Sequence, residues 1–134
     1  MTVPPAGLLD TSVFIARQAQ RPLDKLPDRV AVSVVTLGER LGVLCAVDAA
    51  ARARRGDTLA LAKTAASIPL GESVLGAWAR LVADCRAAGR QRFVKLTDTL
   101  IAATALDLGL PVGTQDNDYD EMAAAHPNLH VIRV

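Results

Sequence analysis

The stretch Gly7-Leu8-Leu9-Asp10-Thr11-Ser12-Val13-Phe14-Ile15 decides the fold class. A short apolar run ends at an acid followed by two hydroxyl residues, and an apolar helical pattern begins after them. This order predicts a buried strand that turns directly into a helix, with Asp10 at the turn. A second continuous apolar run, Val30-Ala31-Val32-Ser33-Val34, is typical of a central strand in a parallel sheet.

Helical patterns separate the predicted strands along the rest of the chain. We expect helices over 13–19, 72–88 and 100–106, a helical hairpin over about 36–66, and short strands over 67–70, 112–114 and 129–134. Gly89 and Gly109 are expected to end two of the helices. Strands that alternate with helices pair in parallel through right-handed crossovers. The fold class is therefore predicted to be α/β: a single domain over 1–134 with three α/β/α layers and a central, mostly parallel sheet of about four to five strands.

The composition is that of a globular domain. The chain has 134 residues, which is about one domain's length at ~100–200 residues each. Hydrophobic residues make up 51% and charged residues 22%, which excludes intrinsic disorder. The formal net charge of +1 excludes a histone-like basic tail, so any contact with nucleic acid has to come from a local basic patch. Only 3% of residues are aromatic, which disfavours a sheet that stacks the bases of a single strand.

The two cysteines, Cys45 and Cys85, lie far apart in alanine-rich, helix-like segments. Their spacing matches neither a zinc site nor a disulfide framework, so we expect both to be reduced core residues. No apolar run approaches the ~18 residues of a membrane helix, and the N-terminal sequence lacks the basic and apolar regions of a signal peptide. We therefore expect a cytoplasmic protein that does not bind membranes.

Four acids fall at predicted strand ends or at the starts of the following helices: Asp10, Glu39, Asp98 and Asp116. Because the carboxyl ends of parallel strands meet at one edge of a sheet, we expect these carboxylates to converge although they lie far apart in the sequence. A cluster of acids without Lys or His among its members is stabilised by a hard divalent cation, and Mg²⁺ and Mn²⁺ prefer oxygen ligands. The chemistry that follows is hydrolysis of a phosphodiester, in which the cation polarises the phosphate and activates a water molecule.

Four sequence blocks resemble a known family. The blocks are Leu8-Leu9-Asp10-Thr11-Ser12-Val13-Phe14-Ile15, Val32-Ser33-Val34-Val35-Thr36-Leu37-Gly38-Glu39, Asp98-Thr99-Leu100-Ile101-Ala102-Ala103-Thr104-Ala105 and Thr114-Gln115-Asp116-Asn117-Asp118-Tyr119. In this order they resemble the signature blocks of PIN-domain ribonucleases, and the chain is most similar to the VapC toxins of bacterial VapBC toxin–antitoxin pairs. The resemblance implies an endoribonuclease that uses Mg²⁺ or Mn²⁺ to cleave structured RNA, either tRNA or ribosomal RNA. It also implies a homodimer and a VapB-like antitoxin as inhibitor, with the hairpin over about 36–66 contacting the antitoxin or the second copy.

The resemblance implies a role for each matched residue. Asp10 and Asp98 correspond to the principal metal ligands, while Glu39 and Asp116 correspond to catalytic acids that support the metal directly or through water. Hydrogen bonds that orient carboxylates or water are expected from Ser12, Thr114 and Asp118. One residue is missing after Glu39 relative to the family, which predicts an irregular helix or a changed antitoxin groove at that point.

Each acid also has an ordinary structural interpretation. Asp10 and Asp98 suit the N-terminal end of a helix, where an acid caps backbone N–H groups or favours the helix dipole. The segment Thr36-Leu37-Gly38-Glu39 has the spacing of a capping box, in which the carboxylate returns to the backbone of Thr36. Asp116 suits an Asx turn in its loop. For Glu39, ligation and capping can hold together.

A basic patch precedes Asp98 in the sequence. Its members are Arg86, Arg90, Arg92 and Lys95. They are candidates for binding RNA phosphates beside the metal, with the solvated C-terminal end of a helix as the structural alternative. Trp78 lies at helical spacing with apolar neighbours and is expected in the core or at a dimer interface.

Two other classes of function fit parts of this pattern. A phosphatase of the haloacid dehalogenase kind also places an Asp after its first strand, but it needs a second Asp two residues later, where this chain has Ser12. The non-enzymatic alternative is a catalytically inactive PIN scaffold that binds RNA or a protein partner. The sequence selects neither the RNA and its cleavage site nor the number of metal ions.

Overall fold

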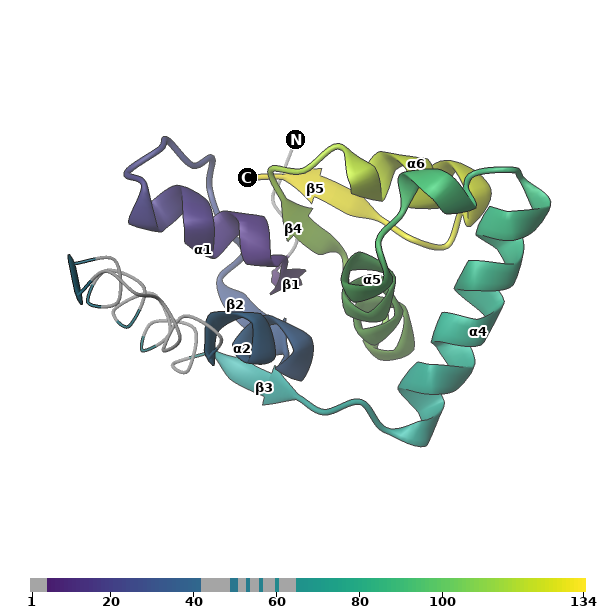
Figure 1. The fold of residues 1–134 in the computed structure, drawn as a ribbon, viewed down its shortest axis with the longest axis horizontal. Helices are drawn as coiled ribbons and strands as arrows, with labels where there is room; N and C mark the ends of the chain where they lie inside the picture. The colour runs from purple at the N-terminus through teal and green to yellow at the C-terminus, as the bar shows by residue number, and fades with distance from the viewer. Residues whose placement is uncertain (1–4, 42–48, 51–52, 54–55, 57–59, 61–64) are drawn as a thin grey trace.

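The computed structural model describes residues 5–41, 49–50, 53, 56, 60 and 65–134 of the chain (Figure 1). Within this part, five strands form one sheet in the order β3-β2-β1-β4-β5, and each neighbouring pair is parallel. The strands are β1 (Ala6–Leu9), β2 (Arg29–Ser33), β3 (Ala66–Ile68), β4 (Val112–Thr114) and β5 (Val131–Arg133). The predicted α/β class with a parallel central sheet is confirmed.

Helices connect the strands and cover both faces of the sheet. They are α1 (Thr11–Gln18), α2 (Val34–Leu41), α4 (Glu72–Ala87), α5 (Leu96–Leu108) and α6 (Asp118–Ala125), with a short 3-10 helix η2 (Gln91–Phe93). Successive side chains of a strand point to opposite faces of the sheet. Accordingly, Leu8 belongs to a core cluster with residues of α4, α5 and α6, whereas Leu9 packs in a second cluster with Val13 and Phe14 of α1.

The central strand β1 sets the position of the carboxyl edge of the sheet. Leu9, its last residue, lies opposite Val32 of β2 and Gly113 of β4, so the three strands end at nearly the same level. A Cβ atom at Gly113 would lie 3.0 Å from the side chain of Leu9, so glycine makes this close pairing possible. The residues that follow β1, β2 and β4 therefore leave the sheet side by side.

The helix α5 runs beside α4 (Figure 1). Its sequence leaves it almost no polar face. Its buried residues are Thr99, Ile101, Ala102, Ala103, Thr104 and Ala105. Short alanine side chains let a helix approach its neighbours closely, and the predicted burial of this helix is confirmed. Asp98 in its first turn is consequently held at the carboxyl edge by a well-packed element.

The start of α2 differs from the prediction that Thr36 opens the helix. The helix begins at Val34, and the Oγ atom of Ser33 accepts a hydrogen bond from the backbone N–H of Val35 at 3.1 Å. Thr36 is fully buried, and its hydroxyl lies 3.0 Å from that of Thr11 on α1. The hydroxyl therefore joins two helices instead of capping one. Beyond Leu41, most of the predicted hairpin and the segment with the missing residue lie outside the described residues.

The prediction of reduced core cysteines can be compared with the structure at Cys85, whereas Cys45 lies outside the described residues. Cys85 is a free thiol on α4, and its side chain is buried in the main core cluster. Burial, followed by the charge of Asp84, raises the pKa of this thiol, so it is a poor nucleophile. In the part of the chain that the structure describes, no helix combines the length and the apolarity needed to cross a membrane.

Gly109 ends α5 in a left-handed conformation, with φ at +66°. A Cβ atom is disfavoured in this conformation, so Gly109→Ala is expected to lower the free energy of unfolding by about 1 kcal/mol. Gly38, an exposed position inside α2, is the matched control because alanine is favoured there, and Gly38→Ala should raise the same quantity by about 0.5–1 kcal/mol. Urea unfolding of both variants checks the opposite signs, and equal signs would contradict the assignment of Gly109 as the helix cap.

Candidate metal centre

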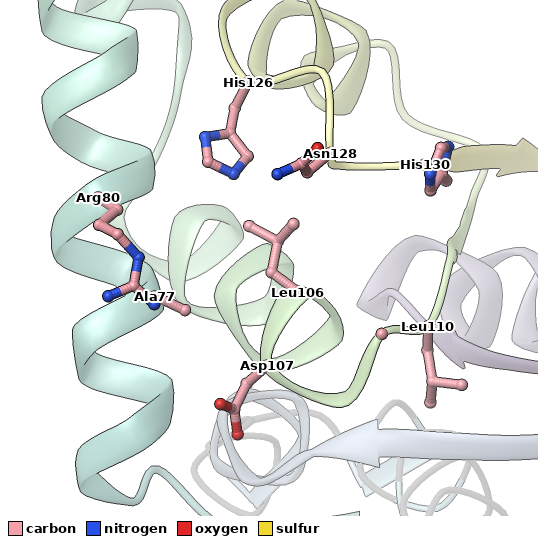
Figure 2. A pocket seen from close by; sticks show the side chains of 9 residues that line it. Ala77, Arg80, Leu106, Asp107, Leu110, His126, Asn128 and His130 are labelled. Carbon is pink, nitrogen blue, oxygen red and sulfur yellow. The ribbon is translucent and has the colours of Figure 1, made fainter.

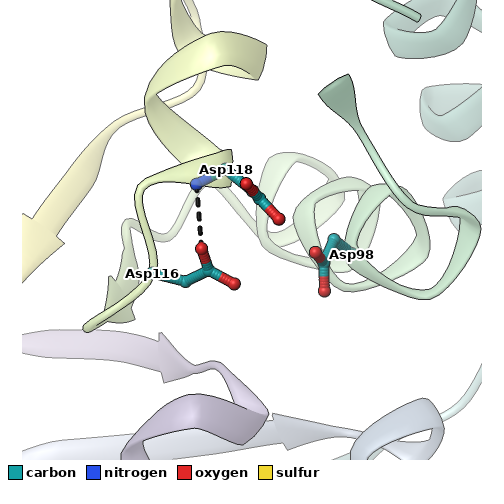
Figure 3. A group of neighbouring side chains, drawn as sticks. All are labelled: Asp98, Asp116 and Asp118. Atoms are coloured by element: carbon teal, nitrogen blue, oxygen red, sulfur yellow. Dashed lines mark hydrogen bonds between the residues drawn. The ribbon is translucent and has the colours of Figure 1, made fainter. Parts of the chain in front are cut away.

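Four aspartates lie at the carboxyl edge of the sheet. Asp10 follows β1, Asp98 lies in the first turn of α5, Asp116 lies in the loop after β4, and Asp118 begins α6. One carboxylate oxygen from each of Asp98, Asp116 and Asp118 lies within 4.8 Å of the others, and the three side chains point toward one another (Figure 3). We call these three residues the aspartate trio. Such a group of oxygens is close enough to share one cation.

Asp98 is the member of the trio whose negative charge is poorly compensated by its surroundings. Its Oδ2 atom is buried and has no hydrogen-bond partner among the described residues. Burial is the main cause that raises the pKa of the Asp98 carboxyl from 3.8 to about 7. Negative charge nearby adds to this shift, and it comes from Asp10, Asp116 and Asp118. The positive charge of Lys95 lowers the pKa of Asp98, but it does not offset these contributions.

Asp116 combines the two interpretations that the sequence allowed. Its Oδ1 atom accepts a hydrogen bond from the backbone N–H of Asp118 at 3.0 Å, which is the predicted Asx turn (Figure 3). The turn also brings the Asp118 side chain toward Asp98, although the sequence suggested only an orienting role for Asp118. The other carboxylate oxygen of Asp116 is not used by the turn.

Asp10 is buried, with 2% of its surface exposed, and it makes three hydrogen bonds. Its Oδ2 atom accepts from the backbone N–H of Ser12 at 3.3 Å and from the hydroxyl of Thr114 at 3.0 Å. Its Oδ1 atom accepts from the hydroxyl of Tyr119 at 2.8 Å. The first of these bonds is the predicted N-cap of α1. The carboxylate thus caps a helix and lies close enough to Asp98 to raise its pKa.

A chain of hydroxyl groups connects Asp10 to the loop that carries Asp116. Thr114 Oγ1 gives its single proton to Asp10 and accepts from the backbone N–H of Asp116 at 2.8 Å. The Ser12 hydroxyl, 3.1 Å away, must then donate to Thr114, and it accepts from the N–H of Gln115 at 3.0 Å. Ser12 and Thr114 are therefore in the positions expected of residues that orient a carboxylate.

Glu39 lies apart from the aspartate trio. Its exposed side chain accepts a hydrogen bond from the Thr11 hydroxyl at 2.8 Å. Because Thr36 also contacts Thr11, a hydrogen-bonded link between α1 and α2 replaces the capping box that the sequence suggested. Among the described residues, neither Glu39 nor Asp10 belongs to the group whose oxygens lie within 4.8 Å of one another.

The predicted basic patch divides into two pairs. Arg90 forms an ion pair with Glu121, and Arg86 donates to the side chain of Gln91 at 3.2 Å. Arg92 and Lys95 instead line a cavity of about 390 Å³ that also reaches Asp118 of the trio. Glu121 lines the same cavity, and Asp118 is the member of the trio beside which the two cations lie.

A larger cavity, of about 620 Å³, lies at the other edge of the sheet (Figure 2). It is bounded by α4, the end of α5 and the segment between α6 and β5, and its polar lining includes Arg80, Asp107 and His130. His126 also lines it, and the Nδ1 atom of His126 lies 2.6 Å from a carboxylate oxygen of Asp84. Because Leu110 and His130 precede β4 and β5, this cavity is separate from the acidic edge.

Comparison with known proteins identifies the family. A sequence model of the PIN domain matches residues 7–125. The chain belongs to the PIN domain family. Within this family it is similar to Ribonuclease VapC8 of Mycobacterium tuberculosis, with 65% identity over 100 residues that cover 74% of this chain and 89% of that protein. It is also similar to Ribonuclease VapC4 of Mycobacterium tuberculosis, with 48% identity over 134 residues that cover 96% of each chain.

A solved structure supports the same assignment. The crystal structure of VapBC-5 from Mycobacterium tuberculosis, a member of the VapBC family of toxin–antitoxin systems, contains a chain of similar fold. The TM-score is 0.86 and the sequence identity is 42%, and the match covers 98% of this chain and 100% of that chain. The resemblance to PIN domains of the VapC type, stated from the four sequence blocks, is confirmed.

Two contacts near the PIN site escaped the sequence reasoning. The Tyr119 hydroxyl reaches Asp10, and burial, followed by the charge of Asp10, raises the pKa of this phenol well above its usual value of 10.0. The half-buried Trp78 donates through its indole N–H to the Thr99 hydroxyl at 2.9 Å, beside Asp98. The signal in the sequence was weak, since each aromatic residue also has the spacing of a core residue. Only the polar group on the ring, the Tyr hydroxyl or the Trp indole N–H, distinguishes such a residue from an ordinary core residue.

Proposed function

We propose that the protein is a metal-dependent endoribonuclease and the toxin of a type II toxin–antitoxin pair. The observation that carries this proposal is the buried, unpartnered Oδ2 atom of Asp98 within a trio of carboxylates. Ionised carboxylates this close repel one another, and a cation between them removes this repulsion. The names of the relatives, Ribonuclease VapC8 and VapC4, support RNA as the substrate.

The donor set fits Mg²⁺ or Mn²⁺, because it consists of carboxylate oxygens without sulfur or imidazole. We expect the aspartate trio to hold the cation, with Asp10 next to it and Glu39 in a supporting role at the rim. A divalent cation in this position supplies neutralisation of the carboxylates and Lewis-acid activation of phosphate and water. The protein contributes the orientation of the carboxylates, because Thr114 and Ser12 hold Asp10 and the loop of Asp116 in fixed positions.

The proposed partners follow from the relatives. The solved VapBC-5 structure comes from a toxin–antitoxin system, and it supports a VapB-like antitoxin as the partner of this chain. We propose that the region about 36–66 contacts the antitoxin or a second copy in a homodimer, and that the protein acts in the cytoplasm on tRNA or ribosomal RNA.

The cavity with Arg92 and Lys95 is the proposed contact for RNA phosphates next to the cleaved bond. Arg92→Gln is expected to raise KM for RNA several-fold and leave kcat unchanged, because it removes a phosphate contact that is the same in substrate and transition state. The slope of log binding affinity against log salt concentration should also become less steep by about 1, because one phosphate contact is lost. Arg21→Gln, at an exposed position after α1, is the matched control and should change neither quantity. An unchanged KM for Arg92→Gln would place the RNA elsewhere.

The proposed activity is tested by mapping RNA ends. Purified protein without its partner is incubated with total cellular RNA in Mg²⁺, Mn²⁺ or EDTA, beside Asp98→Asn and the exposed control Asp24→Asn. We expect discrete cuts that need the metal, persist in the control and disappear with Asp98→Asn. The absence of cuts would refute the catalytic proposal and favour an inactive scaffold that binds RNA or a protein. Cuts that persist with Asp98→Asn would indicate a contaminating nuclease.

A further inference from the structure

Tyr119 combines a core position with a polar contact at the acidic edge. Its side chain is fully buried, and the ring packs in the main core cluster with Leu8, Ile101 and Met122. A buried phenol needs a hydrogen-bond partner, but backbone carbonyls usually provide it. Here the partner is Asp10 Oδ1, 2.8 Å away and 109 residues distant in the sequence.

The Asp10 carboxylate is held by neutral donors alone. No ion pair to Asp10 occurs in the part of the chain that the structure describes. The Thr114 hydroxyl and the backbone N–H of Ser12 both donate to Oδ2, so they fix only one of the two oxygens. Without the Tyr119 hydroxyl, the carboxylate could rotate about that fixed oxygen. The phenol is therefore the contact that sets the plane of the carboxylate.

Tyr119 also belongs to the segment that carries the aspartate trio. It follows Asp118 directly in the first turn of α6, and the Asx turn links the backbone N–H of Asp118 to Asp116. The backbone of Tyr119 thus adjoins Asp118 of the trio, while its side chain contacts Asp10. The hydrogen bond therefore connects the start of α6 to the turn that follows β1.

We propose that Tyr119 is a positioning residue: its hydroxyl fixes the Asp10 carboxylate relative to the aspartate trio and thereby raises the affinity of the site for a divalent cation. This inference rests on the proposed metal centre. Hydrogen-bond partners behind metal ligands typically change metal affinity by about 10–100-fold when they are removed. Because Asp10 keeps two other donors, we expect the lower end of that range.

The test is Mn²⁺ binding to the full chain without RNA. Calorimetric titration with Mn²⁺ should show about 10-fold weaker binding to Tyr119→Phe than to the natural sequence, since phenylalanine keeps the ring and removes only the hydroxyl. Thr104→Val is the matched control, because it removes another fully buried hydroxyl, on α5, which donates to the backbone carbonyl of Leu100. This control should lower the unfolding temperature without changing the affinity for Mn²⁺.

Cleavage assays separate this inference from the proposed function. In Tyr119→Phe, the Mn²⁺ concentration for half-maximal cleavage should rise about 10-fold, with most of the rate restored at saturating Mn²⁺. Equal Mn²⁺ affinity in the natural sequence and Tyr119→Phe would overturn the inference while leaving the ribonuclease proposal intact. Weaker binding to Tyr119→Phe without RNA cleavage by either protein would support the inference and refute the ribonuclease.

Discussion

Replacing Asp98 by Asn is expected to make the metal-free protein more stable at about pH 8 while it removes the cleavage of RNA. The pKa of this carboxyl is raised from 3.8 to about 7, chiefly by burial and then by the neighbouring aspartates. Below the lower value, the carboxyl is protonated in both the folded and the unfolded chain. Between the two values the folded chain holds a proton that the unfolded chain has lost, so stability falls as pH rises. Above about pH 7 the full cost of the buried charge remains.

The size of this effect follows from the two pKa values. A shift of one pKa unit corresponds to about 1.4 kcal/mol, so the difference between the two pKa values sets an upper limit of about 4 kcal/mol on the loss of stability. Asp98 is partly exposed, and solvent screening reduces our expectation to about 2 kcal/mol. Urea unfolding in EDTA at about pH 5 and pH 8 should show a smaller decrease with pH for Asp98→Asn than for the natural sequence.

The same substitution should lower the rate of RNA cleavage by about 10²–10³-fold, the loss typical when a group that organises charge at a reacting centre is removed. Asp24→Asn, which changes an equal charge at an exposed loop position, should alter neither stability nor cleavage. A variant with Asn at position 98 whose stability depends on pH as steeply as before would show that other groups cause the dependence.

Thr114→Val is expected to lower the free energy of unfolding by about 2–4 kcal/mol, because it keeps the shape of a fully buried side chain and removes three hydrogen bonds. The backbone N–H of Asp116 loses its acceptor, and Asp10 loses one donor. Cleavage should fall as well, since the loop that carries Asp116 loses its hydrogen bond to Thr114, although it keeps the contact between Gln115 and Ser12.

The matched variant for this prediction is Thr114→Ser, which keeps the hydroxyl and loses only a methyl group. It should retain most of the cleavage activity and lose about 1 kcal/mol of stability. Urea unfolding and initial cleavage rates at saturating metal check both substitutions. Equal stability and equal cleavage rates for Thr114→Val and Thr114→Ser would contradict a role of this hydroxyl in either property.

The general arrangement of strands and acids could be predicted because it depends on local patterns. The apolar run before Asp10, the mostly apolar helix after Asp98 and the glycine at 109 each carry their signal within a few residues. The rule that parallel strands end at one edge then brings Asp10, Asp98 and Asp116 together. The family match and the VapBC-5 structure confirm the fold built on these signals.

The remaining details depend on contacts between distant segments. Thr36 has the local pattern of a helix cap, yet its hydroxyl forms a hydrogen bond with the hydroxyl of Thr11 on another helix. Arg90 looked available for RNA, but Glu121, 31 residues later, forms an ion pair with it. Asp118 joins the trio because the Asx turn at Asp116 directs it there. Sequence periodicity carries no information on such pairings, so the roles of individual site residues stay predictions.

The central place of β1 also governs when the acidic edge can exist during protein synthesis. The partners of Asp10, Thr114 and Tyr119, are translated 104 and 109 residues after it. Contacts across such long separations form only after both segments are available, and they form slowly because a long loop has to close. A growing polypeptide therefore carries its first acid without the groups that orient it. The edge can assemble only after residues 114–119 have been translated, so translation itself delays the appearance of any activity that resides there.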